Sequence, residues 1–229
     1  MSLLALTLDL DDTLWPVWPA IQRAEHALVA WLQQHAPLTG ARHDVVSLRV
    51  LRDEVGRRQP DWAHDFTRIR LESIRLALQQ HGDDPALAEA AFEAFFTARQ
   101  QVDLFADVLP ALDRMAARWP LVALSNGNAD VRRISGLGRY FHGSLSAREF
   151  GIGKPAAGIF HAACQQLNAP PAQVLHIGDD GALDVDGALD AGLRAAWVQR
   201  SGGPAVAAPR GTPHHTVADL QMLADELGV

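Results

Sequence analysis

Short apolar runs that stop at a polar turn constrain the fold of this chain most strongly. The first run, residues 3–8, carries no charged side chain and is followed at once by Asp9. A run of this kind is typical of a strand buried on both faces of a parallel sheet. Similar runs recur at residues 121–124, 174–177 and 195–198. Helical spacing separates the later runs, so the sequence predicts an α/β fold with a parallel sheet.

The long segment between the first two runs has the spacing of helices instead. Its apolar positions recur at helical intervals, with Pro and Gly residues between them, over residues 20–35, 41–55, 62–81 and 85–102. Such a segment is too long for a plain crossover and too regular for a loop. We therefore predict a four-helix domain at residues 16–105, able to serve as a lid, inserted into an α/β core of residues 1–15 and 106–229. Near the end, a Gly/Pro-rich surface loop is expected over 201–213 and a last helix near 217–227.

Composition excludes several classes of protein. With 229 residues, 48% of them hydrophobic, the chain can bury a sizeable core. Its net charge of -7 and the absence of a basic run argue against nucleic-acid binding. Its one cysteine, Cys164, excludes an internal disulfide and is expected to be a buried helix residue. The opening apolar run has no basic flank, so we expect neither a signal peptide nor a membrane span, but a soluble cytoplasmic protein.

The strongest chemical signal is the acidic cluster that directly follows the first apolar run. Asp9, Asp11 and Asp12 lie within four residues, and folding a sheet does not require three mutually repelling carboxylates at its edge. An acidic turn with a helix cap would explain one of them. Asp9 and Asp11 could face one ligand, where one carboxylate attacks phosphorus and the other protonates the leaving oxygen. Because a phosphate would be repelled by this cluster, the site also needs a cation, and oxygen ligands indicate Mg²⁺.

A second acidic cluster follows the run at 174–177. Asp179 stands at the turn, and Asp184 near the start of the next helix, so both are expected at the same sheet edge as Asp9. Helix capping is the alternative interpretation for Asp180, Asp184 and Asp186, because acids are favoured near helix N-termini. We favour Asp179 as a metal ligand, and leave open which of Asp180 and Asp184 completes the metal shell.

Two further segments carry donors for a phosphoryl group. Ser125 and Asn126 follow the second run, in a Gly-containing turn, and Lys154 follows two nearby glycines. A hydroxyl, backbone N–H groups and an ammonium are the donors that a transferring phosphoryl requires. A helix cap for Ser125 and a solvated loop for Lys154 are the ordinary alternatives. However, Lys154 is the chain's sole lysine, which points to a need for a compact ammonium at this position.

These motifs resemble those of the haloacid dehalogenase-like (HAD) hydrolases. The resemblance rests on residues 9–14, Ser125, Lys154-Pro155, and Gly178-Asp179-Asp180 with Asp184. It implies a Rossmann-like core, a class I helical cap at the inserted segment, Asp9 as nucleophile and Asp11 as general acid/base. It further implies phosphoryl binding by Ser125, Asn126 and Lys154. Mg²⁺ would be held by Asp9, Asp179 and the backbone carbonyl of Asp11, with Asp184 as a partner of Lys154 or an outer ligand.

The resemblance also narrows the reaction. Dehalogenases of the family lack an acid at the position of Asp11, so its presence favours a phosphatase. A phosphonatase would need a cap lysine, and residues 15–105 contain none. The blocks at 119–128, 136–141, 176–180 and, in the cap, 64–70 are similar to bacterial phosphatases that act on flavin mononucleotide and on the phosphorylated ribitylaminouracil intermediate of riboflavin synthesis. The block at 148–153 is common to the wider superfamily, so another small phosphate ester, such as a sugar phosphate or nucleotide, stays open as the substrate.

Several residues near or in the predicted cap have two interpretations each. Trp15 and Trp18 either stack on a substrate ring or pack as structural aromatics. His64, Arg68 and Arg70 either reach the substrate or form a solvated helix face. The pair His214-His215 has no metal-site spacing and is interpreted as part of a surface loop.

Two hypotheses compete with a phosphatase. A phospho-accepting signalling switch also combines acids, a Ser/Thr and a Lys around Mg²⁺, but it has no need of Asp11 or of a lid. A non-catalytic binding module would bind metal without turnover. The oligomeric state stays open.

Overall fold

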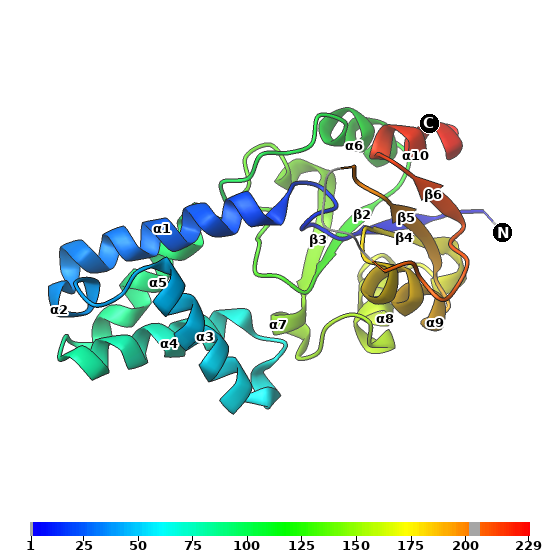
Figure 1. The fold of residues 1–229 in the computed structure, drawn as a ribbon. Helices are drawn as coiled ribbons and strands as arrows, with labels where there is room; N and C mark the ends of the chain where they lie inside the picture. The colour runs from blue at the N-terminus through cyan, green and yellow to red at the C-terminus, as the bar shows by residue number, and fades with distance from the viewer. Residues whose placement is uncertain (1, 202–206) are drawn as a thin grey trace. The chain divides into compact units, whose positions relative to one another are not determined.

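The computed structural model describes residues 2–201 and 207–229 (Figure 1). The chain divides into two compact units, one made of residues 1–16 and 103–229 and the other of residues 17–102. Within the described residues, the sheet belongs to the first unit, and the second unit consists of helices and their connections. No helix among these residues is long and apolar enough to cross a membrane.

The first unit is built on a parallel sheet. In the described part of the chain it has six strands in the order β3-β2-β1-β4-β5-β6. Their bounds are β1 (Ala5–Leu8), β2 (Leu121–Ser125), β3 (Phe141–Ser146), β4 (Val174–Gly178), β5 (Arg194–Val198) and β6 (His215–Val217). The predicted α/β class is confirmed. The chain runs outward from β1 to β3 and returns to β4 on the other side of β1, so the strand order reverses between β1 and β4, where ligands bind in such sheets.

The strands at the centre of the sheet match the prediction, but two strands near its edges were not predicted. Every residue of β1, β2 and β4 is buried, which agrees with their unbroken apolar sequences. β3 lies partly exposed at one edge and includes His, Gly and Ser, so it has no apolar run to find. β6 has three residues at the other edge. The surface-loop interpretation is therefore wrong for His215, which lies in β6 and contacts Glu226 Oε2 through Nδ1 at 2.7 Å.

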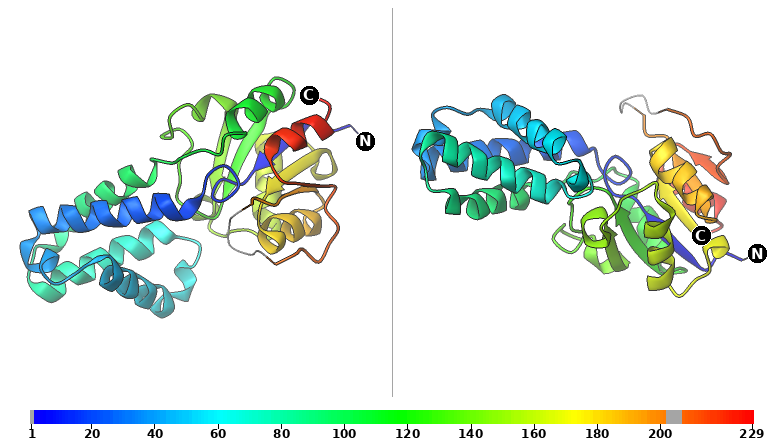
Figure 2. Two further views of the ribbon diagram at one scale, coloured as in Figure 1. Left: turned by 45° about the horizontal axis from the view of Figure 1, so that its top comes forward. Right: turned by 90° about the horizontal axis from the view of Figure 1, so that it is seen from below.

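Helices cover both faces of the sheet (Figures 1 and 2). α6 (Val108–Ala116) and α10 (Leu220–Glu226) pack together on one face, and α8 (Ala157–Gln166) and α9 (Gly187–Asp190) lie on the other. Cys164 is buried in α8, as expected. α10 begins later than predicted because Asp219 accepts a hydrogen bond from Met222 N and caps the helix. The shorter elements are η3 (Gly138–Tyr140), α7 (Ala147–Phe150), η4 (Pro171–Gln173) and the single π-helical turn η5 (Gly181–Asp186).

The predicted loop at 201–213 is described only in part. Residues 202–206 lie outside the described residues, and residues 207–213 contain no helix or strand.

The second unit contains the helices expected of the inserted segment. They are α1 (Val17–His35), α2 (Pro37–Gly40), α3 (Val45–Arg58), η1 (Pro60–Trp62), α4 (Phe66–His81), η2 (Pro85–Leu87) and α5 (Ala88–Arg99). Local signals set their ends. The Asp44 carboxylate accepts from Ser47 N at the start of α3, and Gly82, with φ of 86°, ends α4. Side chains from α1, α3, α4 and α5 form one apolar core, which includes Leu28 and Phe95.

Candidate active site

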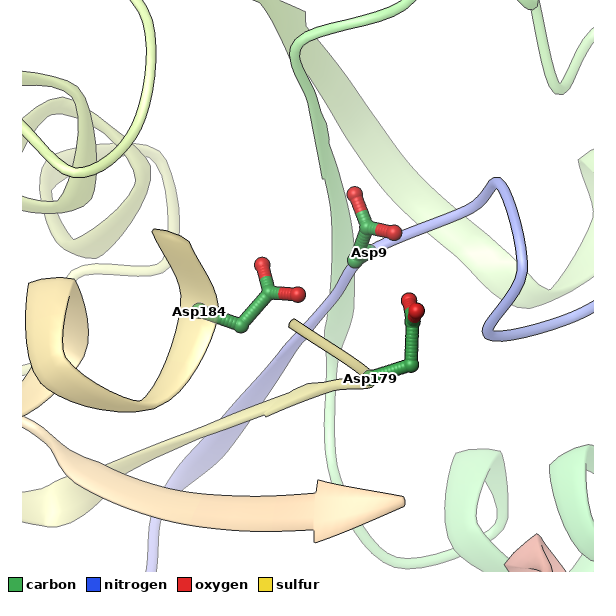
Figure 3. A group of neighbouring side chains, drawn as sticks. All are labelled: Asp9, Asp179 and Asp184. Carbon is green, nitrogen blue, oxygen red and sulfur yellow. The ribbon is translucent and has the colours of Figure 1, made fainter. Parts of the chain in front are cut away.

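Three carboxylates meet where β1 and β4 end. Asp9 follows β1, Asp179 follows β4, and Asp184 lies in η5. Parallel pairing with Leu8 opposite Ile177 brings the ends of the two strands together. Carboxylate oxygens of all three residues lie within 4.8 Å of one another, and Figure 3 shows the groups gathered around one space. The sheet therefore brings together the two acidic clusters that the sequence places 170 residues apart.

Lys154 is the cation at the centre of this group. Its Nζ donates to Asp9 Oδ1 at 2.5 Å and to Asp184 Oδ1 at 2.6 Å. The ammonium side chain is only 2% exposed, so these pairs are buried, and the solvated-loop alternative for Lys154 is wrong. Two carboxylates that would repel each other are therefore held by one shared cation.

Burial and charge perturb these groups in different directions. Burial, reinforced by Asp184 and Asp179, raises the pKa of Asp9 well above its usual value, although Lys154 acts against this. Burial would also raise the pKa of Asp184, but Lys154 and the hydrogen bond with His176 hold it below its usual value. Burial alone lowers the pKa of Lys154, yet Asp184 and Asp9 hold it above its usual value. Lys154 and Asp184 are thus fixed in their charged forms.

Asp179 is placed by two neighbours. Thr13 Oγ1 donates to Asp179 Oδ1 at 2.8 Å and lies 3.3 Å from Asp9 Oδ2, so its hydroxyl stands between the two carboxylates. Trp197 Nε1 donates to the backbone carbonyl of Asp179 at 2.8 Å. Burial and the nearby Asp184 raise the pKa of Asp179 to about 7. A bound cation would reverse this shift, because a positive charge favours the ionised carboxylate.

The donor set fits a hard divalent cation. Carboxylate oxygens are the ligands that Mg²⁺ prefers, and Asp9, Asp179 and Asp184 each offer one. Asp184 already accepts bonds from Lys154, His176 Nε2 and Asp180 N. Asp9 and Asp179 stay the side chains that the sequence predicts to hold the ion. The Asp11 side chain is outside this three-carboxylate group.

Asp180 and Asp186 are engaged elsewhere, and the capping interpretation is confirmed for Asp180 but not for Asp186, whose side chain caps no helix among the described residues. Asp180 Oδ1 accepts from Ala182 N and Leu183 N, both at 2.8 Å. Asp186 accepts from Arg210 N and Gly211 N. Asp184 has two roles, because its Oδ2 accepts from Asp180 N at the start of η5 and its Oδ1 accepts from Lys154.

The end of β2 contributes Ser125 to the same edge. Ser125 is buried, and its Oγ accepts from Gly127 N at 2.9 Å. The neighbouring Asn126 side chain pairs with the backbone of Lys154, accepting from its N–H at 2.7 Å and donating to its carbonyl at 2.9 Å. Asn126, which the sequence predicts to bind phosphate, therefore fixes the loop that carries Lys154.

Asp11 lies in a tight turn after β1. Asp12 N donates to Trp15 O at 2.8 Å, which closes the turn, and Trp15 Nε1 donates to Asp11 Oδ1 at 2.9 Å. Trp15 is fully buried, as the packing interpretation expects, whereas Trp18 is 49% exposed.

The remaining predicted substrate residues lie in the second unit. Arg68 is exposed, and its guanidinium stacks on the Trp62 ring at 3.9 Å. His64 is half-buried just before α4. Arg70 is buried, with its guanidinium 3.8 Å from the centre of the Phe95 ring, so the solvated-face alternative is wrong for Arg70.

Supporting residues of the site were missed at the sequence level. Thr13 was part of the quoted motif but had no assigned role. His176 lies within an apolar strand, 1% exposed, with Nδ1 2.9 Å from Thr7 Oγ1 and Nε2 3.0 Å from Asp184 Oδ1. Because an ionised Asp184 only accepts, Nε2 carries the proton and Nδ1 accepts from Thr7. The sequence signal that could have identified His176 is a histidine between apolar residues of a strand predicted to be buried.

Comparisons with known proteins assign the family. The model of the haloacid dehalogenase-like hydrolases matches residues 3–192. The chain is 36% identical over 203 residues to the 5-amino-6-(5-phospho-D-ribitylamino)uracil phosphatase YigB of Escherichia coli (strain K12), covering 87% of this chain and 84% of the relative. It is 34% identical over 165 residues to a phosphoserine phosphatase of Thermus thermophilus, covering 70% of this chain and 64% of that protein.

A solved structure described as a 2-haloacid dehalogenase from Pseudomonas syringae pv. Tomato DC3000 is 36% identical, with a TM-score of 0.88, and covers 98% of this chain and 97% of that one. The chain therefore belongs to the haloacid dehalogenase-like hydrolases, as the motifs indicated.

Proposed function

We propose that the chain is a Mg²⁺-dependent phosphomonoesterase that works through an aspartyl phosphate on Asp9. The observation that carries the proposal is the shared contact of Lys154 with Asp9 and Asp184, because it presents a buried carboxylate beside a fixed ammonium. Asp9 attacks phosphorus, and the bond between phosphorus and the ester oxygen breaks as Asp11 gives that oxygen its proton. Water, deprotonated by Asp11, then attacks the phosphoryl group and releases phosphate and Asp9.

The chain's own groups supply part of the electrostatic stabilisation in this mechanism. The Lys154 ammonium and the Ser125 hydroxyl face the charge that develops on the phosphoryl oxygens. Asp184, with His176 behind it, keeps Lys154 charged and fixed in place. Asp9 and Asp179 would hold Mg²⁺, which neutralises the repulsion between the phosphate dianion and the carboxylates.

We propose the phosphorylated ribitylaminouracil intermediate of riboflavin synthesis, or flavin mononucleotide, as the substrate. The support is the 36% identity to YigB over 87% of the chain, together with the resemblance of several core blocks to phosphatases of this kind. The helical unit offers Trp18, His64 and Arg68 as candidate contacts for the rest of such a substrate, which carries a ring and a polyol chain. We further propose that this unit acts as the cap, and that the protein acts in the cytoplasm.

A second candidate is a 2-haloacid dehalogenase, because the Pseudomonas syringae structure carries that description at 36% identity. Displacing a halide needs no acid for the leaving group, so Asp11 favours the phosphatase.

The test measures phosphate release from both proposed substrates, phosphoserine, a sugar phosphate, a nucleotide and 4-nitrophenyl phosphate, each with Mg²⁺ and with chelator. Halide release from 2-haloacids is measured in parallel. Mg²⁺-dependent preference for one proposed substrate supports the whole proposal, and even, weak turnover of all esters keeps only the phosphatase. Halide release without phosphate release would replace the phosphatase proposal with the dehalogenase. A long-lived phosphoaspartate without turnover would replace it with the signalling switch.

A further inference from the structure

The only polar atom of the Trp15 side chain faces the Asp11 carboxylate. Trp15 is 0% exposed, and its Nε1 donates to Asp11 Oδ1 at 2.9 Å. The main chain makes this contact possible by turning back on itself. Asp12 adopts a left-handed conformation with φ of 58°, and the backbone bond from Asp12 N to Trp15 O closes the turn. A buried indole N–H requires an acceptor, and here the acceptor is the side chain assigned as general acid.

This contact distinguishes the two oxygens of Asp11. An indole N–H is a donor only, so the oxygen that it contacts, Oδ1, must accept. A protonated oxygen is the weaker acceptor, so this contact favours Oδ2 as the oxygen that carries the proton for a leaving group. That oxygen lies over Gly127, where an added Cβ would be 2.5 Å from Asp11 Oδ2 and 3.3 Å from Ser125 Oγ. Oδ2 is thus turned toward the side of the site on which Ser125 presents its hydroxyl.

We propose that Trp15 is a positioning residue for the general acid, holding Asp11 with Oδ2 directed at the leaving oxygen. This inference rests on the proposed phosphatase function, in which Asp11 is the acid. Trp15 then acts through Asp11 and not by touching the substrate. Its effect should depend on how much protonation the leaving group needs, because only poor leaving groups rely on the acid.

The test is Trp15→Phe, which keeps a buried aromatic ring and removes the N–H. We measure kcat/KM, since it reports the half-reaction in which the leaving group departs. For an alkyl phosphate such as flavin mononucleotide, kcat/KM should fall by about 10- to 100-fold, a part of the effect of a general acid. For 4-nitrophenyl phosphate, whose leaving group departs without an acid, the fall should stay within about threefold.

Trp119→Phe is the matched control. Trp119 is also buried, at 7% exposure, and its Nε1 donates to the Leu3 carbonyl at 3.2 Å. The Trp119→Phe variant therefore loses the same kind of hydrogen bond, but one that does not involve Asp11. For Trp119→Phe, we expect kcat/KM to change by the same factor, if at all, on both substrates. In an Asp11→Asn background, Trp15→Phe should add less than about a twofold change, because its effect runs through Asp11.

Equal losses of kcat/KM on both substrates, or full additivity with Asp11→Asn, would overturn the role of Trp15. If Asp11→Asn itself shows no dependence on the leaving group, the proposed function fails at the general acid. If that variant shows the dependence and Trp15→Phe does not, only the positioning inference fails. Should Trp15→Phe not fold, the indole N–H signals in NMR spectra serve instead: Asp11→Asn should shift one of the six, and the absence of such a shift refutes the contact.

Discussion

Replacing Lys154 by Met should destabilise the protein in a way that depends on pH. Its ammonium contacts Asp9 and Asp184 at 2.5 and 2.6 Å and is 2% exposed. Removing it leaves Asp9, Asp179 and Asp184, with oxygens within 4.8 Å, without their cation. Two unit charges at that separation repel by about 3.5 kcal/mol at an effective dielectric constant of ~20. Breaking a buried ion pair costs a similar amount, about 3 to 5 kcal/mol. We expect a loss of about 4 kcal/mol at pH 8.

The pH dependence follows from the direction of each pKa shift. In the wild type, the pKa of Asp184 is below and that of Lys154 above the usual value, so this pair stays charged between pH 6 and 8 and contributes equally throughout. Asp179, with a pKa of about 7, titrates in this range in the wild type too, so the prediction concerns the difference in unfolding free energy between the two proteins. In the variant, the pKa values of Asp9 and Asp184 rise above those in the wild type and in the unfolded chain, because the ammonium that lowers them is gone. The native variant then binds protons that the unfolded chain does not, and its stability rises as pH falls. For each extra proton bound by the native variant, the difference in unfolding free energy between wild type and variant narrows by about 1.4 kcal/mol per unit of falling pH.

The assay is urea unfolding at pH 6, 7 and 8 with chelator present, followed by circular dichroism and by tryptophan fluorescence to check for coincident transitions. Arg210→Met is the matched control, because Arg210 also contacts two carboxylates, Asp186 and Asp190, at 3.1 Å each, but is 76% exposed. For this control, the difference in unfolding free energy from the wild type should not change resolvably with pH. A deficit for Lys154→Met below about 1 kcal/mol, or one that stays constant from pH 8 to pH 6, would refute the reasoning.

Three further substitutions test other parts of the structure. Asp9→Asn should abolish phosphate release and leave the circular dichroism spectrum unchanged, since the amide keeps the shape of the side chain but cannot act as the nucleophile; substantial residual turnover would reject Asp9. Gly178→Ala should reduce kcat by at least about 100-fold, because the added Cβ would lie 2.2 Å from Asp184 Cγ and displace the partner of Lys154; wild-type kcat would show that this close approach does not matter. Gly56→Ala should stabilise the protein by about 0.5 to 1 kcal/mol, because Gly56 lies inside α3 with its nearest neighbours at 3.8 Å; a lower urea midpoint would contradict this.

The sequence predicts most of the centre of the sheet and the acids at its edge, for one physical reason. A strand buried on both faces must be apolar, so the polar residue that ends it marks the carboxyl edge. Asp9, Ser125 and Asp179 were found in this way. Edge strands lack this signal, because β3 is partly exposed and β6 has only three residues. Both were therefore missed.

The supporting contacts of the site could not be predicted, because they depend on distances between segments far apart in the chain. Nothing in the spacing of residues 9–14 shows that the Thr13 hydroxyl reaches Asp179. Similarly, His176 and Asp184 are separated by eight residues, which indicates no contact until η5 turns back toward β4. The assignment of Asp184 and Asp180 was left open for the same reason, since only the fold shows which one faces Lys154.

The use of lysine at position 154 follows from the geometry of the site. The chain's other 19 Lys+Arg residues are all arginine, so charge alone does not explain the choice. An ammonium is a compact charge whose three N–H bonds point in different directions, whereas a guanidinium presents its donors in one plane. Two of the Lys154 donors reach carboxylates that belong to different elements, Asp9 after β1 and Asp184 in η5. The third is then available to a phosphoryl group in the proposed reaction.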